Sequence, residues 1–150
     1  NWTIAGAPDE VRRFEEGFAS ILPALAPVDA KHSMSDRRPF RRLTVQEREE
    51  IVTLGWRMEP ALLEQAEYLS PSEWHDKLRS GEEVVVIDTR NRYETAIGKF
   101  SGAVDPGIDA FTEFSDWIAR SDIPKTTPVM MYCTGGIRCE KASLEMKRHG

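Results

Sequence analysis

The chain has 150 residues, of which 40% are hydrophobic and 30% are charged, and its formal net charge at pH 7 is −5. This composition is typical of a globular protein, and the acidic balance argues against a surface that is basic throughout, while it leaves room for a local basic patch. No apolar run approaches the roughly 18 residues that a membrane span requires. Two cysteines are too few for a disulfide scaffold, which favours a reducing, cytoplasmic setting.

The first part of the chain combines one helical pattern with several strand-like stretches. A helix is predicted from Pro8, because proline suits a first helical turn and apolar side chains follow at helical spacing. Alternating apolar and polar residues predict strands at 1–6, 28–35, 40–46 and 49–55. We therefore expect residues 1–55 to form a small α+β unit and residues 56–69 to be an irregular linker.

Residues 70–150 alternate between helical and buried-strand patterns. Ser70, Pro71 and Glu73 have the spacing of an N-cap, a first helical residue and a capping box. The runs "EEVVVIDTR" and "TPVMMYC" lack alternation, which indicates strands buried on both faces of a parallel sheet. Helical patterns follow at 111–120 and 139–150. This order predicts an α/β fold, an open and mostly parallel sheet with helices on both faces.

Both cysteines lie in the stretch "MYCTGGIRCEKA", directly after the second predicted strand. Ligands of open parallel sheets bind beyond the carboxyl ends of the strands, which is where Cys133 stands. The loop between Cys133 and Arg138 consists of Thr134, Gly135, Gly136 and Ile137. The amides that begin the next helix and the guanidinium of Arg138 both favour an anion, so a Cys133 thiolate with a lowered pKa is predicted.

The length of this loop bears on the chemistry. Only four residues separate Cys133 from Arg138, fewer than in the cysteine-dependent phosphatases, whose loop must surround a phosphoryl group. A shorter loop suits a single extra sulfur, held as a persulfide. The competing interpretation of Cys133 is a buried structural thiol, which a Gly-Gly loop followed by arginine fits poorly. Cys139 is either a second, resolving thiol or a simple first-turn helix residue.

The stretches "IDTRNRYETAIGKFSGAVDP" and "MYCTGGIRCEKA" together resemble a rhodanese domain. Asp88 and Arg90 match its Asp-x-Arg after a buried strand, and Glu94 matches the acidic residue that follows. The strings "CTGGIRCEKA", "PFRRLTVQEREEIVTLG" and "YLSPSEWH" resemble, more specifically, the rhodanese-related tRNA uridine 5-hydroxylases. That family has a ferredoxin-like domain before its rhodanese domain, and the resemblance covers nearly the whole chain.

The resemblance implies a partial ferredoxin-like domain at 1–55 and a C-terminally truncated rhodanese domain at 70–150, so we expect the chain to be a fragment at both ends. It implies oxygen-dependent hydroxylation of the wobble uridine to 5-hydroxyuridine, with tRNA as partner and molecular oxygen as co-substrate. It gives the catalytic role to Cys133. No cofactor is identifiable in the sequence, and a metal site is not expected, because the cysteines lack paired ligand spacing and the histidines are scattered.

Two further sets of residues are candidates with two interpretations each. We favour a structural ion pair for Asp88 and Arg90 over a direct role in chemistry. Four arginines surround Phe40 in "DRRPFRRL", namely Arg37, Arg38, Arg41 and Arg42. They are either a solvated strand edge or a tRNA-binding patch that contacts phosphates beside a stacking aromatic ring, and the family resemblance favours the second interpretation.

Three functions compete at this point: a tRNA uridine hydroxylase, a sulfurtransferase that carries sulfane sulfur as a Cys133 persulfide, and a tRNA-binding module without catalysis. The first two both need an activated Cys133, so the cysteine loop does not separate them. The presence of the N-terminal domain favours the hydroxylase, because a simple sulfurtransferase does not require it. Nothing in the sequence indicates an oligomeric state.

Overall fold

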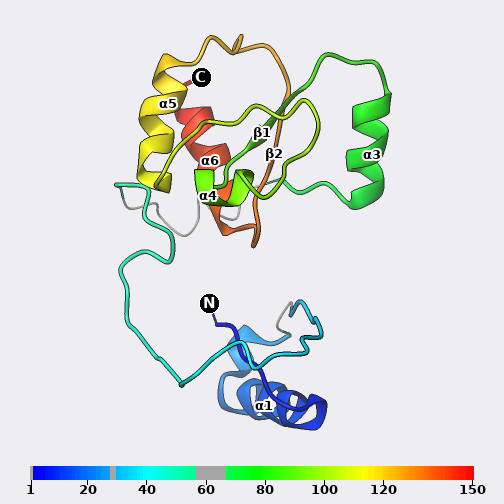
Figure 1. The fold of residues 1–150 in the computed structure, drawn as a ribbon, viewed down its shortest axis with the longest axis vertical. Coiled ribbons are helices and arrows are strands. Elements are labelled where there is room, and N and C mark those ends of the chain that lie inside the picture. Colours follow the sequence, from blue (N-terminus) through cyan, green and yellow to red (C-terminus); the bar gives the residue numbers. More distant parts are fainter. Residues whose placement is uncertain (1, 28–29, 57–66) are drawn as a thin grey trace. The chain divides into compact units, whose positions relative to one another are not determined.

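The computed structural model describes residues 2–27, 30–56 and 67–150, and it divides the chain into two compact units, Asn1–Glu49 and Glu50–Gly150 (Figure 1). Most of the linker expected at 56–69 lies outside the described residues, because 57–66 are not among them. None of the described helices is long and apolar enough to cross a membrane.

The first unit is organised by α1 (Pro8–Ile21), which is followed by the short 3₁₀ turn η1 (Pro23–Leu25). Pro8 occupies the first turn as expected, and the carboxylate of Glu10 accepts a hydrogen bond of 2.9 Å from the amide of Ala7. Trp2 packs against α1, with its ring centroid 5.2 Å from that of Phe14 in an edge-on arrangement. The predicted helix is therefore present, and the aromatic side chain of Trp2 packs on one of its faces.

The strands expected in residues 1–55 do not form among the described residues. A strand requires a neighbouring strand that satisfies its backbone hydrogen bonds, and the described part of these segments pairs with none. Leu43 and Val45 alternate with polar residues but remain 88% and 86% exposed, so their alternation marks no buried face. The α+β expectation for this unit is thus met only in its helix.

Residues 50–55, most of the last segment expected to be a strand, are part of the second unit. Leu54 is buried in the second unit's core, and the carboxylate of Glu50 binds the ammonium of Lys141 at 2.5 Å. The carbonyl of Val52 accepts a further hydrogen bond of 2.6 Å from the same ammonium. These contacts hold residues 50–54 against helix α6 (Ile137–Arg148) without any strand pairing.

The second unit is built on two parallel strands, β1 (Val85–Asp88) and β2 (Val129–Tyr132). Their register sets Val85 opposite Val129 and Asp88 opposite Tyr132. A single parallel bridge joins Ile87 to Val104 on the other side of β1. Both runs that lack alternation therefore form parallel strands, with Ile87, Asp88 and Met130 buried and the other strand residues half-buried, and the α/β class is confirmed.

Helices surround these strands, in the chain order α3 (Pro71–Arg79), α4 (Arg92–Thr95), η2 (Phe111–Glu113), α5 (Phe114–Arg120) and α6. The capping box predicted for α3 is present: the hydroxyl of Ser70 accepts from the amide of Glu73, whose carboxylate accepts 2.7 Å from the Ser70 amide. α6 packs against β2 and α5. Of these helices, η2, α5 and α6 supply side chains to the apolar core, namely Phe111, Phe114, Ile118, Ala142 and Leu144.

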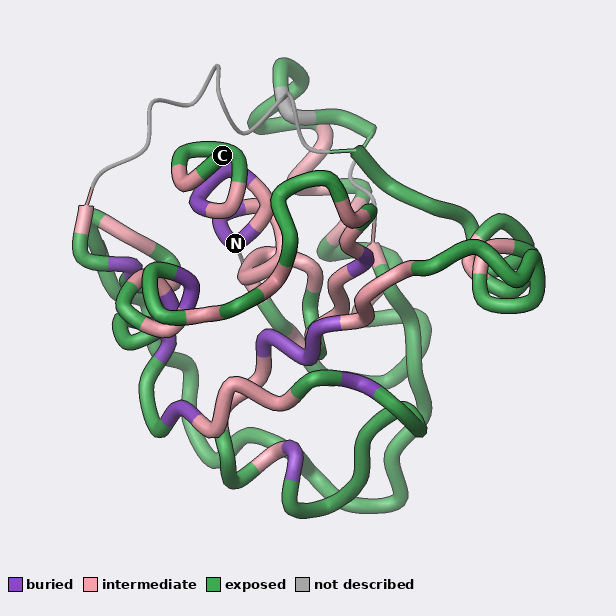
Figure 2. Tube along the Cα trace, turned by 90° about the horizontal axis from the view of Figure 1, so that it is seen from above, coloured by how far each residue is buried: buried purple, intermediate pink, exposed green. Residues whose placement is uncertain are grey.

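The core of the second unit lies between β1, α5 and α6, where Figure 2 shows the buried stretches of the chain. Ile87 and Phe114 are fully buried, and the Phe114 ring stacks between Phe111 and Trp117 at centroid distances of 5.4 and 5.5 Å. This packing fixes α6 against the sheet. The loop that joins β2 to α6 is consequently held at both of its ends.

Candidate active site: the cysteine loop

The cysteine loop runs from the end of β2 to the start of α6. Cys133 directly follows the last strand residue, and α6 begins at Ile137. Gly136 precedes the helix with φ of 86°, a left-handed conformation that strains any residue with a Cβ. The turn back from strand to helix therefore depends on glycine at position 136.

The loop curls around the sulfur of Cys133. The amide of Gly136 donates a hydrogen bond of 2.9 Å to the Cys133 Sγ. A hydrogen bond from the Cys139 thiol is the main reason that the pKa of Cys133 falls to about 5, and the amides of Cys139, Gly136 and Gly135 lower it further against the opposing effect of burial. Cys133 is accordingly a thiolate at neutral pH, as the sequence predicts.

Cys139 is the second thiol of the site. It lies in the first turn of α6, and its sulfur is 3.6 Å from the hydroxyl of Thr89 at the end of β1. Its hydrogen bond to the Cys133 sulfur, together with burial, raises the pKa of Cys139, so this thiol keeps its proton. Both cysteines are free. The site thus combines a cysteine of lowered pKa, Cys133, with a cysteine of raised pKa, Cys139.

Arg138 is held by an acidic partner from α4. Its guanidinium makes two hydrogen bonds to the carboxylate of Glu94, at 2.5 and 2.7 Å, and both side chains are only 13% exposed. The hydroxyl of Thr134 donates 2.7 Å to the same carboxylate. The Arg138 guanidinium lowers the pKa of Glu94 to about 2. The arginine that the sequence offers as an anion ligand is therefore already paired, and it ties the loop to α4.

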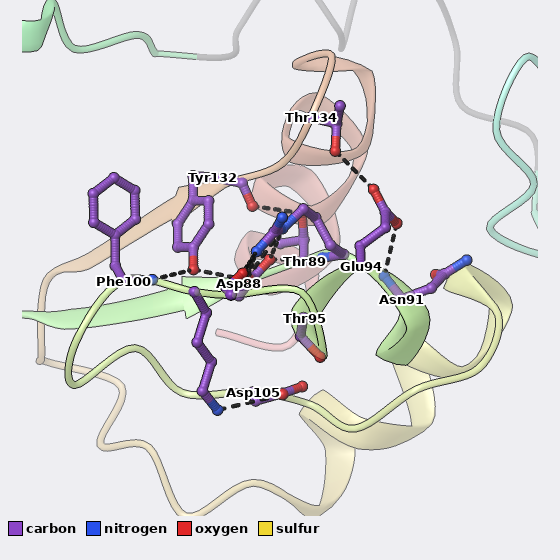
Figure 3. A network of polar contacts seen from close by, with 12 residues as sticks. Asp88, Thr89, Asn91, Glu94, Thr95, Phe100, Asp105, Tyr132 and Thr134 are labelled. Atoms are coloured by element: carbon purple, nitrogen blue, oxygen red, sulfur yellow. Dashed lines mark hydrogen bonds and ion pairs between the residues drawn. The ribbon is translucent and has the colours of Figure 1, made fainter.

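A second network lies beside the loop at the end of β1, centred on the fully buried Asp88 (Figure 3). Arg90 donates from Nε and Nη2 to the two carboxylate oxygens at 2.9 and 2.7 Å, and the hydroxyl of Tyr132 donates at 2.6 Å. Burial alone raises the pKa of Asp88, but these donors outweigh it and the pKa is lowered. Asp88 and Arg90 form an ion pair, the arrangement that the favoured interpretation requires.

Sequence reasoning gave Tyr132 no role and identified Glu94 only through the rhodanese pattern. The parallel register sets Tyr132 opposite Asp88, which brings the hydroxyl to the carboxylate. The tyrosine that closes a buried strand was the available signal, since a tyrosine hydroxyl needs a partner when it is buried. No local pattern pairs Glu94 with Arg138, because 44 residues separate them.

The arginines predicted to bind phosphate lie in the first unit, whereas the cysteine loop belongs to the second. Arg37, Arg38, Arg41 and Arg42 are all exposed. Among the described residues, no group of three or more His, Cys, Asp or Glu side chains is arranged to hold a metal ion. Within the second unit, the structure thus brings together the cysteine loop, Asp88 and Arg90, and the arginine patch belongs to the first unit.

Comparison with known proteins places these features in a family context. No family model matches the chain. The chain is 40% identical over 154 residues to a tRNA uridine(34) hydroxylase of Bartonella quintana, and 44% identical over 151 and 152 residues to proteins of that name from Rhizobium etli and Agrobacterium fabrum. The matches cover 100% of this chain and 48–49% of those proteins, so the chain spans about half the length of the curated relatives it matches. The resemblance to the tRNA uridine hydroxylases that the three strings of the sequence indicate is confirmed.

The pKa of Cys133 can be tested by alkylation. Because only the thiolate reacts, we expect the rate of Cys133 labelling by iodoacetamide to be half-maximal near pH 5 and constant from pH 7 to 9. Labelling of Cys139 is expected to be slow throughout, because its pKa is raised. Peptide mass spectrometry at a series of pH values gives both rates. A Cys133 rate that climbs through pH 8.5, as for an ordinary thiol, contradicts the loop geometry.

The same labelling experiment on Cys139→Ala tests the hydrogen bond from the Cys139 thiol, the largest cause of the lowered pKa of Cys133. Removing the thiol donor leaves only the amides, so the midpoint for Cys133 is expected to move up by at least about one pH unit. Cys139→Ser keeps a hydroxyl donor and is the matched control, with a smaller upward movement. Identical midpoints in all three proteins would mean that Cys139 does not bond to the thiolate.

The Glu94–Arg138 pair is expected to stabilise the fold in a pH-dependent way. The carboxyl pKa is about 2 when folded and about 4.3 when unfolded, so the contribution is complete above roughly pH 5 and disappears as the pH falls through 4 towards 2. At pH 7, Glu94→Gln should lower the free energy of unfolding by about 2–3 kcal/mol in urea titrations, and by progressively less below pH 4. Glu82→Gln removes the exposed Lys77–Glu82 pair and should cost under about 1 kcal/mol. Equal losses of unfolding free energy in the two variants would show that the Glu94–Arg138 pair stabilises the fold no more than the exposed Lys77–Glu82 pair.

Proposed function

We propose, from the relationship of this chain to curated tRNA uridine(34) hydroxylases, that it carries the reactive cysteine of an enzyme that converts the wobble uridine of tRNA to 5-hydroxyuridine. The observation that carries the proposal is the thiolate of Cys133, set in a curled loop beside a protonated second thiol. Molecular oxygen is the co-substrate and tRNA the partner. Cys133 is the catalytic residue, and the loop amides of Gly135 and Gly136 help to hold its thiolate.

The stoichiometry of hydroxylation requires two electrons, and Cys139 can take part in supplying them. One atom of O₂ enters the C5–H bond of uracil as a hydroxyl, and the other atom must leave as water, which takes two electrons and two protons. Cys133 and Cys139 supply the two electrons if they close a disulfide, and the Cys139 thiol supplies one of the protons while solvent supplies the other. A thiol reductant then restores both cysteines. The place of Cys139 in the first turn of α6, where its thiol lowers the pKa of Cys133, supports this pairing.

The sulfurtransferase is the second candidate, and the short loop favours it. Four residues between Cys133 and Arg138 leave room for one added sulfur, and a thiolate with a lowered pKa is the form that accepts sulfane sulfur. The two candidate functions differ in the nucleoside formed, which is 2-thiouridine for sulfur transfer and 5-hydroxyuridine for hydroxylation. A deletion strain that loses 2-thiouridine and keeps 5-hydroxyuridine favours sulfur transfer, and loss of neither nucleoside favours a tRNA-binding module.

The proposal is tested by restoring variants of the intact protein to a deletion strain and measuring wobble-position nucleosides by mass spectrometry. Cys133→Ser should abolish 5-hydroxyuridine while tRNA binding stays intact, because a serine hydroxyl remains protonated near neutral pH. Cys139→Ser should reduce 5-hydroxyuridine less severely. With purified protein, excess dithiothreitol should restore turnover to Cys139→Ser and not to Cys133→Ser. Wild-type levels of 5-hydroxyuridine in Cys133→Ser would remove the thiolate from the mechanism.

The exposed arginines of the first unit are proposed to contact tRNA phosphates. Replacing Arg37, Arg38, Arg41 and Arg42 by Gln should weaken tRNA binding and reduce the slope of log affinity against log salt by about three to four. Fluorescence anisotropy at several salt concentrations measures that slope. The control is replacement of Arg12 and Arg13, which are exposed on α1, and should leave it nearly unchanged. An unaltered slope in the fourfold variant would identify the patch as a solvated surface only.

A further inference from the structure

The Cys133 thiolate lines a cavity of about 420 Å³. The cavity is wide open to solvent, so a group that is attached to a larger molecule can enter it. Cys133 and Thr134 form one part of the lining, and residues 98–100 form another, with Arg90 and Tyr132 completing it. The proposed function, which concerns a macromolecule as large as tRNA, leaves open which part of that molecule enters here.

Residues 98–100 are held in place by the network around Asp88 (Figure 3). The carbonyl of Gly98 accepts a hydrogen bond of 2.6 Å from Nη2 of Arg90, and the amide of Phe100 donates 3.0 Å to the hydroxyl of Tyr132. Arg90 and Tyr132 both donate in turn to the buried carboxylate of Asp88. A loop segment that would otherwise be free is thereby fixed from two directions, next to the reactive sulfur.

The side chains on this fixed segment suit a nucleotide. The ring of Phe100 is supported edge-on by Tyr132 at a centroid distance of 4.7 Å, yet Phe100 remains 51% exposed. The ammonium of Lys99 lies 3.3 Å from the Asp105 carboxylate and keeps 40% of its side chain accessible. RNA bases that are displaced from their stack bind on aromatic rings, and neighbouring cations contact their phosphates.

We propose that Phe100 is the stacking surface for the target uracil and that Lys99 contacts an adjacent phosphate, so that residues 98–100 deliver the base to Cys133. The inference rests on the proposed function and names the subsite through which that function selects its base. Enzymes that modify a base must receive it outside the stack, and a base in a single-stranded loop leaves its stack at low cost. Asp88, Arg90 and Tyr132 act as positioning residues, because they reach the base only through the segment that they hold.

Photocrosslinking tests the location directly. An RNA anticodon stem-loop that carries 5-iodouridine at the wobble position is irradiated with the intact protein, and the adduct is mapped by peptide mass spectrometry. The expected adduct is on Phe100 or Tyr132, the two aromatic rings of the cavity lining. Adducts found only elsewhere, for instance on Phe40 in the first unit, would overturn the proposal.

Kinetics of 5-hydroxyuridine formation test the energetic role. Loss of one base–aromatic contact weakens binding by a factor of about 5 to 150, so Phe100→Leu should raise KM for tRNA at least about fivefold with a smaller change in kcat. Phe100→Tyr keeps the ring and should restore KM to near the wild-type value. Tyr93→Leu is the matched control, since Tyr93 is 70% exposed and does not line the cavity. A wild-type KM in Phe100→Leu would contradict stacking.

The lysine is tested through salt dependence. Lys99→Gln should reduce the slope of log affinity for the stem-loop against log salt by about one, the value for one phosphate contact. Lys77→Gln is the control, because Lys77, like Lys99, pairs with a surface carboxylate. Lys77 lines a different cavity, which shares no residue with the cavity of Cys133. An unchanged slope in Lys99→Gln would contradict the proposed contact between Lys99 and a phosphate.

Failure of this inference and failure of the proposed function give different results. If 5-hydroxyuridine is formed and Phe100→Leu keeps the wild-type KM and crosslinking pattern, the subsite is wrong and the hydroxylase stands. If the wild-type protein forms no 5-hydroxyuridine but crosslinks to the stem-loop at Phe100, the hydroxylase is wrong and the base-binding subsite stands.

Discussion

The parallel pairing of β1 with β2 is the constraint on which the site depends. Its register ends both strands together, with Asp88 opposite Tyr132, so the residues that follow each strand emerge at one edge of the sheet. Arg90 follows β1 and Cys133 follows β2. A shift of one residue in this pairing would reverse the faces of every side chain in the strand, separating the tyrosine hydroxyl from the carboxylate. The apolar packing of Ile87 against Phe114 and its neighbours holds the register and thereby the chemistry.

The cysteine loop stabilises a thiolate mainly through hydrogen bonds. Arg138, the most obvious source of positive charge, is bound in a bidentate pair by Glu94, so it serves chiefly to anchor the loop to α4. The Cys139 thiol and the loop amides supply the hydrogen bonds that the Cys133 sulfur requires. Such donors are fixed before any substrate arrives, and the sulfur therefore needs no rearrangement to become nucleophilic.

Features that depend on nearby residues were predictable from the sequence, and those that depend on distant contacts were not. The Ser70 cap, the two buried strands and the glycine turn before α6 each follow from a few adjacent residues. The strands expected at 40–46 and 49–55 do not form among the described residues, because alternation describes a face without supplying a partner strand. The Glu94–Arg138 and Asp88–Tyr132 contacts each join residues 44 positions apart, beyond the reach of any local pattern.

The charges around the Cys133 cavity bear on which reactant it receives. Two cations, Arg90 and Lys99, face two carboxylates, those of Asp88 and Asp105, and the Cys133 thiolate adds a third negative charge. Arg138 adds a cation that interacts with the thiolate, and the carboxylate of Glu94 offsets its net charge. A neutral uracil ring can approach the Cys133 thiolate without charge repulsion, whereas an anion that comes into contact with the sulfur itself meets its negative charge. The half-exposed ring of Phe100 belongs to the same lining and offers that uracil an apolar surface, which agrees with the base-binding role proposed for residues 98–100.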